Sequence, residues 1–167
     1  MLIVFDLDDT LIDTSSSITP VRLKEALLEM IKHGLKLPNF QKVLKKLLDI
    51  NEKSKSSNEA LEIFVDNLKI EKKNENLGKK ILQSENLGGI KINTFHNVKK
   101  TLQSLAKNHT LALLSRGNER LQLNKMEKAG IDSTLFSKIV ITDKNNKKNY
   151  YKQFLEDFKD IDTHSNW

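Results

Sequence analysis

A short apolar run at the start of the chain leads directly into two carboxylates. Leu2 to Phe5 is wholly apolar, and Asp6, Asp8 and Thr10 follow it at alternate positions. Alternate residues of an extended chain point to the same side, so the two carboxylates are expected to face the same way. Such a run is typical of a buried strand of a parallel sheet, whose reactive crevice lies at the carboxyl ends of the strands. Two like charges this close repel unless a cation or proton lies between them, which disfavours a purely structural role for both.

A second apolar run ends in residues suited to binding an anion. Residues Thr110 to Leu114 form the run, and Ser115, Arg116 and Gly117 come directly after it. The serine hydroxyl can hydrogen-bond an anion, and glycine lets the backbone approach one closely. We interpret this stretch as a second strand.

A helix is predicted after this second strand. Asn118 is a favourable N-cap and Gly130 a favourable end. The apolar face at near-helical spacing consists of Leu121, Leu123, Met126 and Ala129.

A third strand is predicted at Lys138 to Thr142, followed by Asp143 and a group of lysines. By itself a lysine cluster such as this is typical of a solvated basic turn. The group consists of Lys144, Lys147 and Lys148, and the helix after it contains Tyr150, Phe154 and Phe158.

The long stretch between the first two strands has leucine-rich amphipathic segments and no strand-like run. Four helices are predicted there, which together indicate a small bundle. Thr19 and Pro20 are interpreted as the N-cap and first turn of the first of them. The predicted helices are Val21 to His33, Phe40 to Ile50, Glu59 to Leu68 and Asn76 to Gln83, with Gly88 and Gly89 as the return hinge.

The motif D-x-D-x-T at Asp6, Asp8 and Thr10 resembles the signature of the haloacid dehalogenase superfamily. The resemblance implies that Asp6 is a nucleophile that forms an aspartyl phosphate and that Asp8 is the general acid and base. It also implies Mg²⁺ held at Asp6, through its carboxylate, and at Asp8, through its backbone carbonyl. The dehalogenase and phosphonatase branches lack an acid at the position of Asp8, so its presence favours phosphoryl transfer.

The resemblance extends to the second and third motifs. It implies phosphate binding by Thr10, Ser115, Arg116 and Gly117, and a site lysine for which Lys144 is favoured over Lys147 and Lys148. The helical stretch resembles the cap domain of the first cap class, which closes over the phosphate site and sets substrate choice. The expected architecture is an α/β, Rossmann-like parallel sheet at residues 1–14 and 94–167, with an all-helical cap at residues 15–93.

The fourth motif of the superfamily, a strand with a Gly-Asp pair, is not found. Asp157, Asp160 and Asp162 are weak substitutes, because the first two are interpreted as part of the preceding helix and its end. The expectation is therefore a chain truncated before its last core strands. The first strand would then have an unpaired edge, which favours self-association or pairing with a strand of a partner chain.

Composition narrows the class of protein. The sequence contains no cysteine, which fits a reducing cytoplasm, and no apolar run approaches the ~20 residues of a membrane span. Residues 15–93 hold 15 Lys and Arg against 10 Asp and Glu, a net charge of +5. This charge would attract anionic substrates, but the lysines are spread rather than clustered, which favours ordinary solvated surface positions. Nucleic-acid binding is not expected, because most aromatic residues fall at core spacing rather than along a basic stripe. The four histidines show no zinc-ligand spacing.

These observations predict a Mg²⁺-dependent phosphatase that hydrolyses a small phosphorylated metabolite through an aspartyl phosphate. Two alternatives remain: a phosphomutase of the same fold, and a non-catalytic binding or scaffold protein that lacks the fourth motif. The substrate itself does not follow from the sequence.

Overall fold

The computed structural model describes residues 1–143 and 147–159. Clustering of the backbone divides the chain into two compact units. One comprises Met1–Thr14 and Lys91–Trp167, and the other comprises Ser15–Ile90. Each unit has its own core and is described separately below.

The first unit is built on a parallel sheet, in agreement with the predicted α/β fold. Its strands are β1 (Leu2–Phe5), β2 (Thr110–Arg116) and β3 (Phe136–Thr142), in the order β1-β2-β3. Val4 pairs with Ala112, and Ser115 pairs with Ile141. The third strand begins at Phe136, earlier than the predicted Lys138, because the residues just before it form a short 3-10 helix, η1 (Ser133–Leu135). Within the part of the chain that the structure describes, β1 is an edge strand, and self-association there stays a prediction.

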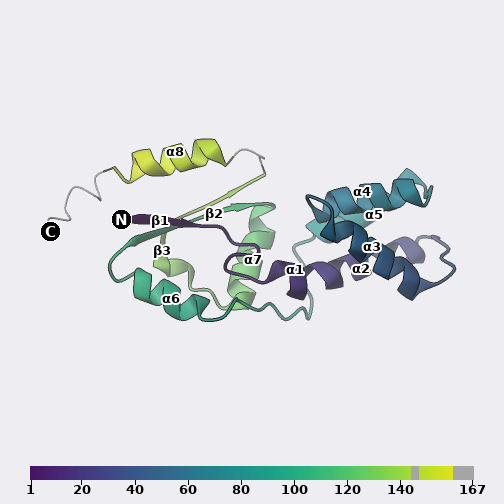
Figure 1. Ribbon diagram of the computed structural model, residues 1–167, viewed down its shortest axis with the longest axis horizontal. Helices are drawn as coiled ribbons and strands as arrows, with labels where there is room; N and C mark the ends of the chain where they lie inside the picture. Colours follow the sequence, from purple (N-terminus) through teal and green to yellow (C-terminus); the bar gives the residue numbers. More distant parts are fainter. Residues whose placement is uncertain (144–146, 160–167) are drawn as a thin grey trace. The chain divides into compact units, whose positions relative to one another are not determined.

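Helices cover both faces of this sheet (Figure 1). Helix α8 (Lys148–Asp157) lies on one face, where Phe154 is buried against Ala112 and Leu114 of the central strand. On the other face lie α6 (Val98–Leu105) and α7 (Glu119–Ala129). The sheet is therefore covered as in doubly wound folds, and its carboxyl-terminal edge is left for a site.

Helix α7 begins and ends where the sequence predicts. The side chain of Asn118 accepts a hydrogen bond of 3.0 Å from the backbone N–H of Leu121. Gly130 ends the helix with φ +66°, a left-handed conformation that favours glycine. The predicted apolar face is wrong in part, because Leu123 is exposed and the buried positions are Gln122, Lys125, Met126 and Ala129.

The second unit consists of helices around an apolar core. After the short helix α1 (Thr14–Ser17), which spans the boundary between the units, come α2 (Thr19–Lys32), α3 (Phe40–Glu52), α4 (Ser57–Asn67) and α5 (Lys72–Gln83). The fully buried residues of this core include Leu23, Leu27, Met30, Leu47, Leu61 and Phe64. None of the helices within the described residues is long and apolar enough to cross a membrane.

Helix boundaries in this unit differ from the predicted ones for local reasons. Thr19 lies inside α2 rather than capping it, and the preceding Ile18 makes no side-chain cap. Helix α4 starts before the predicted Glu59, because Ser56 accepts a 3.2 Å hydrogen bond from the N–H of that residue and is the true N-cap. Helix α5 starts at Lys72 rather than Asn76, since its polar first turn carries no apolar signal but includes the buried Glu75.

Candidate functional site

The loop after β1 places both N-terminal carboxylates at the carboxyl end of the sheet. Leu7 is fully buried, and its carbonyl accepts hydrogen bonds from the N–H groups of Leu11, at 3.0 Å, and Ile12, at 3.1 Å. Asp9 has φ +53°, so the chain reverses direction immediately after Asp8. The apolar anchor and the tight turn together fix the positions from which the two side chains project.

The carboxylate of Asp6 is paired with a lysine from the loop after β3. One oxygen, Oδ2, accepts a hydrogen bond of 2.6 Å from Lys147 Nζ. The other, Oδ1, accepts one of 2.8 Å from the backbone N–H of Leu7. Lys147 Nζ also donates to the carbonyl of Leu114, at 3.2 Å. Because 42% of the Asp6 side chain is exposed, its carboxylate is held in place and yet reachable by a ligand.

The carboxylate of Asp8 is engaged by three donor groups. Its Oδ1 accepts from Thr14 Oγ1, at 2.6 Å, and from Lys125 Nζ, at 2.8 Å. Its Oδ2 accepts from Gln122 Nε2, at 2.7 Å. Burial raises the pKa of this carboxyl, but the charge of Lys125 and the hydrogen bonds from Gln122, Lys125 and Thr14 outweigh it and hold the pKa below its usual value. Asp8 is therefore ionised at neutral pH in this structure.

Gln122 links Asp8 to the end of β2. Its Nε2 lies 2.7 Å from Ser115 Oγ and 3.0 Å from the carbonyl oxygen of Arg116. Both Gln122 and Ser115 are buried. Since the Ser115 oxygen accepts this bond, its own hydrogen can be donated to an anion.

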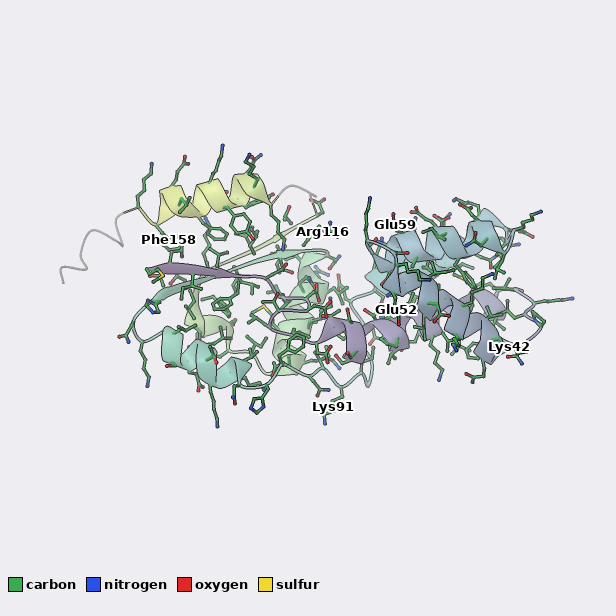
Figure 2. The ribbon with its side chains drawn as sticks, viewed as in Figure 1. Lys42, Glu52, Glu59, Lys91, Arg116 and Phe158 are labelled. Atoms are coloured by element: carbon green, nitrogen blue, oxygen red, sulfur yellow. The ribbon has the colours of Figure 1, made fainter. Side chains whose placement is uncertain are left out.

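A pocket of about 300 Å³ opens at this edge of the sheet and is lined by Asp6, Asp8, Arg116 and Lys147. Arg116 is the last residue of β2 and is exposed there (Figure 2). The volume is at the lower end of the range for small-molecule sites. Two acidic and two basic side chains line the pocket, and the basic ones can bind a small anionic ligand.

The predicted site residues differ in where the structure places them. Asp6, Asp8 and Arg116 line the pocket, and Ser115 lies directly behind it through Gln122. Thr10 is exposed in the loop and is not among the lining residues. Gly117 has φ +145°, and its N–H donates to the carbonyl of Thr142, at 2.9 Å, so this amide is already paired.

Of the two candidate lysines that the structure describes, one is placed at the site. Lys147 contacts Asp6, whereas Lys148 is exposed in the first turn of α8. Lys144, the residue favoured by the sequence, lies outside the described residues. Among the candidates for a further acid, Asp157 forms an ion pair with Lys138, and Asp160 and Asp162 lie outside the described residues.

Sequence reasoning missed three residues that contact Asp8: Thr14, Gln122 and Lys125. A signal was present for the last two. They lie three residues apart and share their helix face with Met126 and Ala129, which together follow the helical i, i+3, i+4, i+7 spacing. Two polar residues on an otherwise apolar, buried helix face indicate that this face packs against a polar site.

The donor set suits Mg²⁺ in part. Asp6 offers a half-exposed carboxylate whose two oxygens each accept a single hydrogen bond, so lone pairs remain for a cation. The hydrogen bonds of the turn use the carbonyls of Leu7 and Ile12 and, within the described residues, none involves the carbonyl of Asp8. Among the described residues, no three His, Cys, Asp or Glu side chains lie close enough together to hold a metal ion by themselves. Proteins commonly bind Mg²⁺ through one or two carboxylates, with waters and substrate phosphate as the other ligands. The residues at this site therefore fit a Mg²⁺ ion.

Residues 1–162 match the family of haloacid dehalogenase-like hydrolases. The chain therefore belongs to this family. Comparison with curated proteins found no similar sequence.

Solved structures show the same fold. A haloacid dehalogenase-like family hydrolase from Xanthomonas campestris is 22% identical, with 95% of this chain and 69% of that chain covered and a TM-score of 0.54. A hydrolase of the same family from Bacillus subtilis, described as bound to magnesium, is 16% identical, with 93% and 71% covered and a TM-score of 0.59. A protein from Thermotoga maritima, assigned as a beta-phosphoglucomutase, is 19% identical, with 95% and 70% covered and a TM-score of 0.60. At these identities the likeness establishes the fold alone.

Proposed function

We propose that this protein is a Mg²⁺-dependent phosphatase that hydrolyses a small phosphorylated metabolite through an aspartyl phosphate. The observation that supports it most is the geometry at Asp6. This carboxylate faces a small pocket, accepts a 2.6 Å hydrogen bond from Lys147 and has Asp8 and Arg116 beside it on the pocket wall. A nucleophile, a counter-charge for the phosphoryl group and a proton-transfer group thus lie within one pocket.

In the first step a carboxylate oxygen of Asp6 attacks phosphorus and the bond from phosphorus to the leaving oxygen breaks. Lys147 and Arg116 stabilise the negative charge on the phosphoryl oxygens. Ser115 is buried behind the pocket and supports this end of β2 through its contact with Gln122. Asp8 gives a proton to the leaving oxygen, so an alcohol departs and the phosphoryl group stays on Asp6.

In the second step Asp8 takes a proton from water, which attacks the aspartyl phosphate, releases inorganic phosphate and restores Asp6. The low pKa of Asp8 makes its resting form a proton acceptor, which suits this second step. For the first step Asp8 must be protonated, and a dianionic phosphate bound beside it favours that form because like charges raise a carboxyl pKa. The same residue then serves both steps.

Mg²⁺ would be held by the Asp6 carboxylate and the Asp8 carbonyl. When bound, it neutralises phosphoryl charge and reduces the repulsion between the substrate and the attacking carboxylate. The remaining positive charge comes from the chain itself, through Lys147 and Arg116. A cytoplasmic location is part of the proposal, and the absence of cysteine from the sequence is compatible with it.

A phosphomutase is the second candidate, supported by the structural similarity to the protein assigned as a beta-phosphoglucomutase. In that reaction the phosphoryl group passes from the aspartate to a sugar hydroxyl rather than to water. Both reactions use Asp6 and Asp8 in the same roles, and only the acceptor differs. A non-catalytic scaffold is less favoured, because the exposed Asp6–Lys147 pair and the pocket beside it have no evident structural use.

The direct test is phosphate release from p-nitrophenyl phosphate by this chain, with Mg²⁺ and with EDTA. We expect release with Mg²⁺ that falls by at least about 100-fold with EDTA, because the cation carries part of the charge stabilisation. Sugar phosphates are assayed alongside, and isomerisation without net phosphate release would favour the mutase. Absence of both reactions over a panel of small phosphate monoesters would contradict the proposal.

The site lysine is tested by exchanging two lysines separately. Lys147→Met removes the donor 2.6 Å from Asp6, and we expect kcat to fall by about 100- to 1,000-fold, the usual loss for one preorganised charge donor. Lys144→Met removes the same charge three positions earlier, and we expect a smaller loss than for Lys147→Met, because Lys147 is the lysine that contacts Asp6. The reverse ranking in steady-state kinetics would assign the role to Lys144 and overturn the assignment made from the structure.

A further inference from the structure

We propose that Gln122 and Lys125 of α7 are positioning residues for Asp8. They hold its carboxylate in one orientation and leave a single oxygen position open for proton transfer. The inference rests on the proposed phosphatase function and concerns how that function is achieved.

The hydrogen bonds of Asp8 distinguish its two oxygens. Oδ1 accepts two bonds, from Thr14 Oγ1 and Lys125 Nζ, which use both of its lone pairs. From the described residues Oδ2 accepts one bond, donated by Gln122 Nε2, which leaves one of its lone pairs unused by them. Because Asp8 lines the pocket, that remaining position on Oδ2 is the one at which a leaving oxygen or a water can exchange a proton.

The two positioning side chains are themselves held firmly. Gln122 is 1% exposed and Lys125 is 8% exposed, and they lie one turn apart on the buried face of a helix with both ends capped. Gln122 also contacts Ser115 Oγ and the Arg116 carbonyl through the same nitrogen. A rotation of Asp8 away from the pocket would break contacts to both residues, so α7 ties the proton-transfer group to the anion-binding end of β2.

The amide of Gln122 carries one acceptor that the described fold does not use. Within the described residues its Oε1 is buried and has no hydrogen-bond partner. A buried acceptor without a partner lowers stability, and the hydrogen bonds of Nε2 to Asp8, Ser115 and the Arg116 carbonyl offset that cost. The polar contacts of this side chain therefore all lead to Asp8 and to the end of β2, as a positioning role predicts.

The test compares two phosphate esters that differ in their need for an acid. p-Nitrophenolate leaves readily without a proton, whereas the alkoxide of glycerol phosphate requires one. For Gln122→Met and Lys125→Met we expect kcat with glycerol phosphate to fall by about 10- to 100-fold, the cost of misplacing a catalytic group, with KM nearly unchanged. With p-nitrophenyl phosphate the loss in the first step should be smaller by at least about fivefold, measured as the burst of p-nitrophenolate.

Matched controls separate charge and size from position. Lys128→Met removes the same charge from an exposed position on α7, and Gln103→Met makes the same exchange at an exposed position on α6. Both should leave the two activities within about twofold, since exposed substitutions usually have small effects. Lys125→Arg, which keeps a charged donor, should recover most of the glycerol phosphate activity.

The unfolding midpoint of each variant is measured by urea titration. Gln122→Met loses the hydrogen bonds of Nε2 to Asp8, Ser115 and the Arg116 carbonyl, so we expect a lower midpoint than for the wild type, and the activities are compared where every variant is folded. An active wild type with variants that lose both activities equally would overturn the positioning role and leave the phosphatase assignment intact. A wild type inactive on both esters would overturn the assignment, and the positioning role with it.

Discussion

Asp6→Asn is expected to abolish turnover while the protein remains folded. Asparagine cannot form the acyl phosphate, so phosphate release should fall by about four to six orders of magnitude, as for removal of other covalent nucleophiles. The effect on stability should be below about 1 kcal/mol, because the Asp6–Lys147 pair is partly exposed and asparagine can still accept the bond from Leu7. The measurements are steady-state phosphate release and acid-quench trapping of the phosphoenzyme.

Asp9→Asn is the matched control for this variant. Asp9 lies in the same loop and has φ +53°, a conformation that asparagine tolerates well. It is exposed and is not among the residues lining the pocket, so its exchange should change kcat by less than about threefold. Turnover by Asp6→Asn above about 1% of the wild-type rate would remove Asp6 from the role of nucleophile.

Asp8→Asn should lower kcat by about 100- to 10,000-fold, the usual contribution of general acid–base catalysis. Both half-reactions depend on this carboxyl, so formation and hydrolysis of the phosphoenzyme should slow together. Rapid-quench measurement with the purified chain resolves the two rates. A variant that forms the phosphoenzyme at the full rate with glycerol phosphate would show that another group protonates the leaving oxygen.

The difference in stability between the wild type and Asp8→Asn should depend on pH. The folded-state pKa of Asp8 is depressed, so the ionised carboxylate stabilises the fold at pH values above the ordinary aspartate pKa of about 3.9. That contribution is lost as the pH falls through the folded pKa. The wild-type advantage over Asp8→Asn in urea unfolding should therefore be present at pH 7 and shrink below about pH 4. A stability difference that grows as the pH falls would contradict the hydrogen bonds and the ion pair assigned to the Asp8 carboxylate.

Much of the fold followed from local patterns. The three apolar runs became parallel strands because each is short, apolar and bounded by polar turn residues. Asn118 and Gly130 marked the ends of α7 because capping is a local interaction between a side chain or backbone conformation and the nearest turn. Helix starts without such a local signal, as at α5, were predicted too late.

The site was predicted unevenly. Asp6, Asp8 and Arg116 line one pocket because they lie at or just after the ends of two parallel strands, and such strand ends converge. Lys144 is favoured over Lys147 by the superfamily pattern, because Asp143 directly precedes Lys144, whereas the structure pairs Lys147 with Asp6. The roles themselves still depend on the experiments above.

The sequence by itself determined the family, the parallel sheet and the two carboxylates at its edge, since these depend on short-range order along the chain. Only the tertiary structure decided which lysine pairs with Asp6 and which face of α7 is buried. Gln122 and Lys125 are separated from Asp8 by more than a hundred residues, with distances of 2.7 and 2.8 Å in the fold. A polar side chain on a buried helix face is explained only by the group it meets, and that partner is set by how α7 packs against the sheet.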